Sequence, residues 1–196
     1  MENDEISMNE RESMELIISM INKAKNNFSE RGILYLAWGW VILFCCITQF
    51  VGDHFFHYEN THLVWLLIYA VIIFQIIYLR GKRHIQKAKT YTGDINAFVW
   101  ITFFICMMII IFICLRYEKY DLIYPLLLVL YGMPTFLSGF IIKFQPLIIG
   151  GICCWILAII SPFINVEYHV LFIGAAVIVA WIIPGYLLKA KFKKQN

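Results

Sequence analysis

Six long apolar runs divide the chain, and they constrain its fold more than any other feature. A membrane-spanning helix needs about 20 apolar residues, within a range of about 17–25. Each run fits this range, and none contains Asp, Glu, Lys or Arg. The runs are Ile33–Val51, Leu63–Leu79, Ala97–Leu115, Leu122–Ile142, Pro146–Phe163 and Val170–Leu188. Because apolar residues are continuous rather than alternating, we expect helices and not the strands of a membrane barrel.

The composition supports lipid as the surrounding solvent. Of the 196 residues, 61% are hydrophobic and 15% are charged, whereas a soluble domain has roughly 25% charged residues. The net charge of +3 gives no indication of nucleic-acid binding. We therefore predict an all-α, six-span transmembrane bundle over residues 33–188, embedded in the lipid bilayer. A cytoplasmic amphipathic helix and linker (1–32) would precede it, and a basic cytoplasmic tail (189–196) would follow.

The positions of Lys and Arg predict the orientation. If six spans alternate, 14 of the 16 basic residues fall on one side, and only Arg116 and Lys119 fall on the other. Cytoplasmic loops are enriched in Lys and Arg. We therefore expect both termini, the Arg80–Lys89 loop and the turn at Lys143 to lie in the cytoplasm. The first 15 residues are acidic, unlike the start of a signal peptide, so we expect the first run to remain as an anchor.

The segment before the first run has a helical pattern. Ser7–Glu10 fits a capping box, and apolar residues then recur at helical spacing. This apolar face would consist of Met14, Ile17, Ile18, Ile21 and Phe28. Two hypotheses follow. The helix lies along the inner leaflet with Lys23 and Lys25 near anionic lipid, or it docks on another protein or on the bundle's own loops.

Polar and helix-bending residues in the spans suggest a solute path. Pro134 lies near the middle of the fourth run, beside Gly132, where it should kink the helix. Broken helices often carry transporter binding sites, although Pro and Gly are also frequent as simple packing features. A path for a neutral solute would use Gln75, Tyr131 and Ser138 in addition to these two residues. Alternatively, Gln75 pairs with a polar group on another helix.

A histidine-rich loop follows the first run. His54, His57 and His62 lie within ten residues of one another, together with two carboxylates, and such groups are common ligands of zinc. Glu167 and His169 are expected on the same side of the membrane. The competing interpretation is an interfacial loop whose rings lie among lipid headgroups. We expect no cofactor.

Small residues stand four apart in the last three runs, a spacing that lets helix backbones approach closely. We therefore expect these spans to pack tightly on one another, although the same stripes could face a second copy of the chain. The pairs are Thr135 and Gly139, Gly150 and Cys154, and Ala176 and Ala180.

Several glycine and aromatic motifs carry a resemblance. The stretches Leu130–Gly139 and Lys143–Gly151, with Tyr35–Trp40 at the start and Ile183–Leu188 at the end, resemble a family of small, uncharacterised bacterial membrane proteins with six helices. This resemblance implies a bacterial cytoplasmic membrane as the location. It implies no activity.

Three classes of function remain. The first is a non-enzymatic protein that acts through protein or lipid partners in sensing or regulation, with residues 5–28 and the Arg80–Lys89 loop as its cytoplasmic face. The second is a transporter or channel for a small neutral or amphipathic solute. The third is a membrane enzyme that uses the histidine-rich loop. The lack of ionisable side chains inside the runs disfavours proton relays and ion-coupled pumps, and no G-x-S-x-G motif is present.

Overall fold

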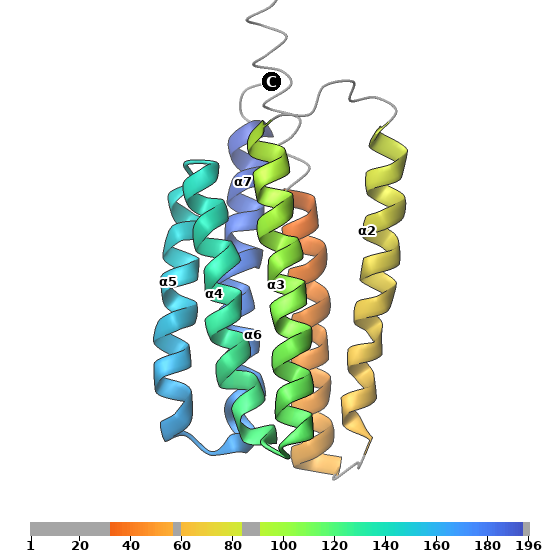
Figure 1. Cartoon of the computed structure of the whole chain (residues 1–196), viewed down its shortest axis with the longest axis vertical. Helices are drawn as coiled ribbons and strands as arrows, with labels where there is room; N and C mark the ends of the chain where they lie inside the picture. The colour runs from red at the N-terminus through yellow and green to blue at the C-terminus, as the bar shows by residue number, and fades with distance from the viewer. Residues whose placement is uncertain (1–31, 57–59, 84–90, 194–196) are drawn as a thin grey trace, which may run out of the picture.

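The structure, a computed structural model, describes residues 32–56, 60–83 and 91–193. Within these ranges the helices run up and down in chain order (Figure 1). The first span, Gly32–Phe56, ends in a wide π turn over Gly52–Phe56. The second span, Thr61–Tyr78, begins with the 3₁₀ turn η2 (Thr61–Leu66). The remaining helices are α2 (Leu67–Arg83), α3 (Tyr91–Arg116), α4 (Ile123–Ile141), α5 (Gln145–Ile160), α6 (His169–Val177) and α7 (Ile183–Lys193).

Six helices of the described residues are long and apolar enough to cross a membrane, with mean hydropathy between 1.6 and 3.0. Their outer surface carries large apolar side chains such as Phe112, Ile77 and Ile159. Lipid tolerates such a surface, whereas a soluble monomer rarely exposes large apolar patches. The predicted all-α fold with six spans is therefore confirmed, and the chain is a multi-pass membrane protein. The predicted amphipathic helix lies in residues 1–31, outside the described residues, and remains a prediction.

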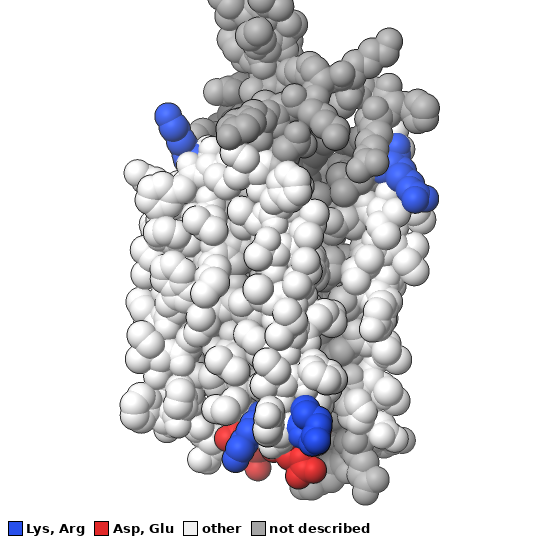
Figure 2. All heavy atoms as spheres, viewed as in Figure 1, with Lys and Arg blue, Asp and Glu red and all other residues white. Residues whose placement is uncertain are grey.

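Charged side chains gather at the two ends of the bundle (Figure 2). Among the described side chains, one end carries Arg80, Lys143 and Lys189, and we call it the basic end. At the opposite end, acidic groups outnumber basic ones, and we call it the acidic end. Its charged residues are Asp53, Arg116, Glu118, Lys119, Asp121 and Glu167. Each of these five basic side chains lies on the side that six alternating spans predict, and the other basic residues lie outside the described side chains.

Spans four to six pack closely because small residues lie where their backbones meet. A Cβ atom added at Gly150 of α5 would lie 2.7 Å from the Cα atom of Ala180, closer than atoms can approach. A Cβ atom at Gly139 of α4 would lie 2.7 Å from the backbone nitrogen of Ile148. Thr135, Cys154 and the other paired small residues are also buried. The prediction that these spans pack on one another is therefore confirmed.

The sixth span changes its winding near its middle. After α6 the chain forms the π turn η6 (Ile178–Ile182) before it continues as α7. Pro184 follows directly in the first turn of α7 and has no N–H to donate to the carbonyl four residues earlier. A wider turn is one way in which a helix accommodates such a missing hydrogen bond. The span therefore continues through its proline as a single element.

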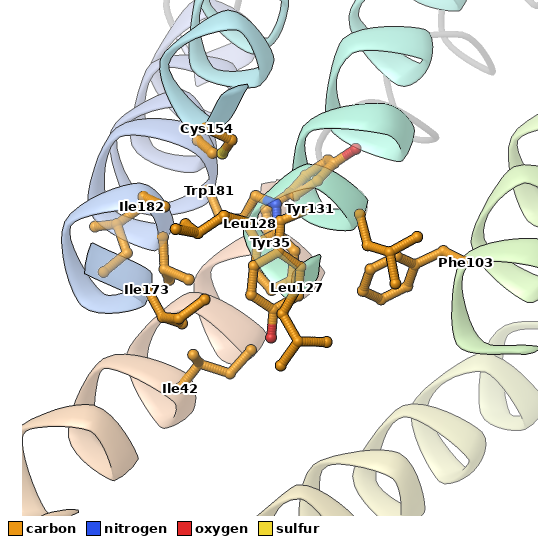
Figure 3. Close-up of a cluster of buried hydrophobic side chains, with 14 of the residues drawn as sticks. Tyr35, Ile42, Phe103, Leu127, Leu128, Tyr131, Cys154, Ile173, Trp181 and Ile182 are labelled. Carbon is orange, nitrogen blue, oxygen red and sulfur yellow. The ribbon is translucent and has the colours of Figure 1, made fainter. Parts of the chain in front are cut away.

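An aromatic cluster fills the interior between α3, α4 and the sixth span (Figure 3). Trp181 lies with its ring centroid 5.0 Å from that of Tyr131 and 5.6 Å from that of Trp100. Its indole N–H donates a hydrogen bond of 2.9 Å to the hydroxyl of Thr135, which itself donates to the carbonyl of Tyr131 at 2.7 Å. The indole N–H of Trp181 and the hydroxyl of Thr135 are thus paired inside the bundle, as burial in hydrocarbon requires.

The second span stands apart from the other helices (Figure 1). Only 6% of the residues in its most apolar stretch are buried, compared with 56% in the sixth span. Val71 is a buried exception. The side chain of Gln75 accepts a hydrogen bond of 2.6 Å from the indole of Trp38, which joins α2 to the first span. The predicted pairing of Gln75 across helices is confirmed.

Candidate functional site

A hollow of about 590 Å³ opens at the acidic end, where three spans meet. The end of the first span, the first turn of α4 and the start of the sixth span form its walls. Its volume lies within the roughly 300–1,000 Å³ of ligand pockets. It is lined by Gln49, Phe50, Asp53, His54, Tyr124, Val166, Glu167 and Val170. The wall therefore combines two carboxylates and an amide with aromatic and aliphatic surface.

Gln49 anchors the inner part of this hollow. Its side-chain oxygen accepts two hydrogen bonds, one of 2.6 Å from the indole of Trp65 and one of 3.0 Å from the hydroxyl of Tyr124. An indole N–H can only donate, so this network identifies the acceptor as the amide oxygen. The three residues come from the first span, the second span and α4. Their hydrogen bonds link these three helices. They also pair the amide oxygen of Gln49, whose burial in apolar surroundings without a partner would cost free energy.

His54 and the two carboxylates occupy the outer part. The Nδ1 atom of His54 lies 4.0 Å from a carboxylate oxygen of Glu167, so the first and sixth spans approach each other here. The ring of His54 stacks on Phe50 with centroids 5.4 Å apart and planes 6° from parallel. Asp53 accepts a hydrogen bond from the hydroxyl of Thr61. Asp53 and Phe50 both belong to the end of the first span, and Glu167 lies at the start of the sixth. The carboxylates and the aromatic ring of this wall therefore lie next to one another.

The predicted metal site is only partly within the described residues. His54 and His62 lie at the acidic end, and His57 lies outside the described ranges. Within those ranges, no group of three or more His, Cys, Asp or Glu side chains is arranged to hold a metal ion. His169, which we placed on the same side, is buried at the start of α6, where its Nε2 atom lies 3.0 Å from the carbonyl oxygen of Ile164. The zinc hypothesis remains a prediction that depends on His57.

The residues of the predicted solute path are not gathered around one hollow. Gln75 is bound to Trp38 at the edge of the bundle, while Tyr131 and Ser138 are buried within it. Gly132 lies against the ring of Trp155, whose Nε1 atom would be 2.3 Å from an added Cβ atom. α4 continues as a helix through Pro134. These positions are occupied by packed side chains.

A second hollow is lined in part by Pro134. It has a volume of about 370 Å³ and lies between α3 and α4. Apart from Thr102, its lining is made of apolar side chains, among them Phe98, Phe103 and Met133. Such a surface suits lipid chains better than it suits a polar solute.

Sequence reasoning found only part of the acidic-end hollow. Asp53 and His54 belong to the histidine-rich loop that we singled out, and Glu167 was expected on the same side. Tyr124 was missed, because an isolated Tyr at a span end resembles any interfacial aromatic residue. The docking residues Met14, Ile17, Ile18 and Ile21 lie outside the described residues, so that hypothesis is untested.

Comparisons with protein-family models, with curated proteins and with solved structures found no significant match to this chain. The resemblance to a family of small bacterial membrane proteins therefore stays a prediction, and arguments about function rest on the chain's own residues.

Proposed function

We propose that this multi-pass protein is non-enzymatic and acts through protein or lipid partners in sensing or regulation. The observation that supports this proposal best is the packed interior. The buried rings of Phe103 and Trp181 both contact Tyr131, one of the residues of the expected solute path. The charged side chains described at the basic end are cationic, as is typical of a cytoplasmic face, and a cytoplasmic face is accessible to soluble partners.

We further propose a bacterial cytoplasmic membrane as the location, with both termini in the cytoplasm. The basic end supports this orientation, because the three charged side chains described there are all cationic while the acidic end has a net negative charge. A matched pair of cysteine variants tests it. On a background without the six native cysteines, Glu118→Cys should react with a membrane-impermeant maleimide in intact cells. Lys143→Cys should react only after permeabilisation, and the reverse pattern would overturn the orientation.

The partner role is tested at the predicted docking face. Ile17→Glu and Ile21→Glu would place a charge in the apolar face of the N-terminal segment, and Glu15→Lys provides a charge change off that face. We expect a partner crosslinked in native membranes to be lost from both isoleucine variants and kept by Glu15→Lys. Retention of every crosslinked partner by all three variants, at equal expression, would contradict docking through this face.

The alternative is transport of a small neutral or amphipathic solute. The acidic-end hollow is the observation that favours it, because a path needs an entrance. Transport would also require the cluster around Trp181 to open. Proteoliposomes separate the two proposals. We expect the swelling rate in glycerol or urea to equal that of empty liposomes, and a faster rate that Tyr131→Trp abolishes would favour transport.

A further inference from the structure

We propose that the acidic-end hollow binds an ammonium group, carried either by a lipid headgroup or by a free soluble amine. This inference does not depend on the proposed function, because it concerns one ligand site and not what the protein does with it. Its basis is the combination of a ligand-sized cavity, an excess of negative charge and an aromatic wall.

The charge of the wall selects a cation. Among the described residues that line the hollow, Asp53 and Glu167 are acidic and none is Lys or Arg. His54 faces Glu167 at 4.0 Å, and even a protonated His54 would leave one negative charge in excess. A cleft lined by one sign of charge between low-dielectric walls concentrates ligands of the opposite sign.

The spacing of the acidic groups favours a polyatomic cation over a bare metal ion. Asp53, His54 and Glu167 all line the hollow, yet no three such groups among the described residues are arranged around a point that could hold a metal. An ammonium group with its substituents spans a larger space than an ion bound within about 2–2.6 Å of each ligand. The cavity volume of about 590 Å³ accommodates such a group.

The aromatic residues give the wall a second attraction for ammonium. Phe50 and Tyr124 line the hollow, and the faces of such rings attract cations, as in the aromatic cages that bind quaternary ammonium ligands. Gln49 holds the Tyr124 hydroxyl at 3.0 Å, and His54 stacks on Phe50. These contacts restrain both rings before a ligand arrives, and preorganisation reduces the entropy cost of binding.

The hollow is placed where an amine can reach it from two sources. It lies at the span ends, beside aromatic residues such as Trp65 and Tyr168, and such residues mark the headgroup region of a bilayer. A phospholipid with an ethanolamine or choline headgroup would present its ammonium group at this depth. A soluble amine would enter from the aqueous side of the same opening.

A pair of probes of the same shape tests the charge requirement. The full chain, purified in a neutral detergent, is titrated by calorimetry with choline and with 3,3-dimethyl-1-butanol, its uncharged analogue. We expect choline to bind about tenfold or more tightly than the alcohol, since interactions with a charged partner are commonly worth this factor. Asp53→Asn and Glu167→Gln should each weaken choline binding by a similar factor. Asp121→Asn, at the same end but outside the lining, should leave it unchanged.

Native mass spectrometry tests whether the amine belongs to a lipid. Phosphatidylethanolamine and phosphatidylglycerol compete for the protein, and the lipid that stays bound is identified. Selective retention of phosphatidylethanolamine that Glu167→Gln abolishes would identify a headgroup site, and choline binding without this retention would identify a site for a free amine. The proposal is overturned if neither ligand is selected, or if Asp53→Asn and Glu167→Gln behave like Asp121→Asn. Size-exclusion profiles confirm that each variant is folded, and Glu167→Gln suffices if Asp53→Asn misfolds.

Discussion

Spans four to six and the second span are equally suited to lipid, yet they meet the rest of the protein in different ways. The most apolar stretches of α5 and of the second span have mean hydropathies of 2.1 and 2.0. The backbones in the first group approach one another closely at Gly139, Gly150 and Gly151, where an added Cβ atom would collide with a neighbouring backbone. α2 instead presents bulky side chains such as Ile73 and Ile77 outward.

This difference shows that hydropathy and helix association are separate properties of a membrane sequence. Lipid tails are as apolar as Leu, so burying an apolar side chain between helices gains little hydrophobic energy. Close packing and internal hydrogen bonds decide which helices associate. Spans four to six have both, whereas the second span is joined to the first by hydrogen bonds, from Trp38 to Gln75 along α2 and from Trp65 to Gln49 before it, and buries little of its surface.

The largest contrast is expected from one substitution made in both regions. Ile173 has 0% of its surface exposed, whereas Ile77 is 66% exposed. Ile173→Ala leaves a cavity in the packed interior and should lower the free energy of unfolding by about 2–5 kcal/mol. Ile77→Ala should change it by less than about 0.5 kcal/mol. Unfolding in mixed micelles with increasing SDS measures both, and equal losses would remove the distinction between the two regions.

Glycine substitutions should give a smaller contrast of the same kind. Gly150→Ala places a methyl group 2.7 Å from the Cα atom of Ala180, and a backbone cannot move aside easily. We expect a loss of about 1–3 kcal/mol. Gly81→Ala in α2 meets no atom within 4 Å and should be neutral or slightly stabilising. A tolerated Gly150→Ala, with an unchanged thermal midpoint in detergent, would show that spans five and six have room to separate.

The smallest effect is expected at the bond that holds α2. Gln75→Leu removes the acceptor of the Trp38 indole, and interhelical hydrogen bonds in membranes contribute about 0.6–2 kcal/mol. Because α2 is otherwise loosely packed, we expect faster amide hydrogen exchange in α2 with little change in global unfolding. Slower or unchanged exchange in α2, or a large drop in global stability, would mean that other contacts hold this helix. Gln75→Glu serves as a control that keeps an acceptor.

The sequence predicted the features that depend on composition along a helix. Continuous apolar runs indicated six spans, small residues four apart indicated where spans four to six pack, and a lone Gln indicated a partner on another helix. It could not predict that α2 would stand apart. Apolar side chains cover every face of a membrane-spanning helix, so the sequence does not show which face, if any, packs against other helices. It also could not bring Tyr124 and Glu167 to Gln49 and Asp53, since these residues are separated by more than 70 positions and meet only through helix order.

The wide turn at Ile178–Ile182 has a consequence for how the sixth span tolerates change in length. A π turn holds one residue more than the α-helical turn it replaces, and each residue in an α-helix advances the rotation by about 100°. Deleting one residue there would restore regular winding and leave the rest of α7 facing as it does now. Gly185, whose Cβ position would lie 3.3 Å from the Gly32 carbonyl oxygen, would then still face the first span. A deletion outside the turn would instead rotate everything after it by about 100°, so the π turn is the place where this span can change by one residue without losing its alignment with the first span.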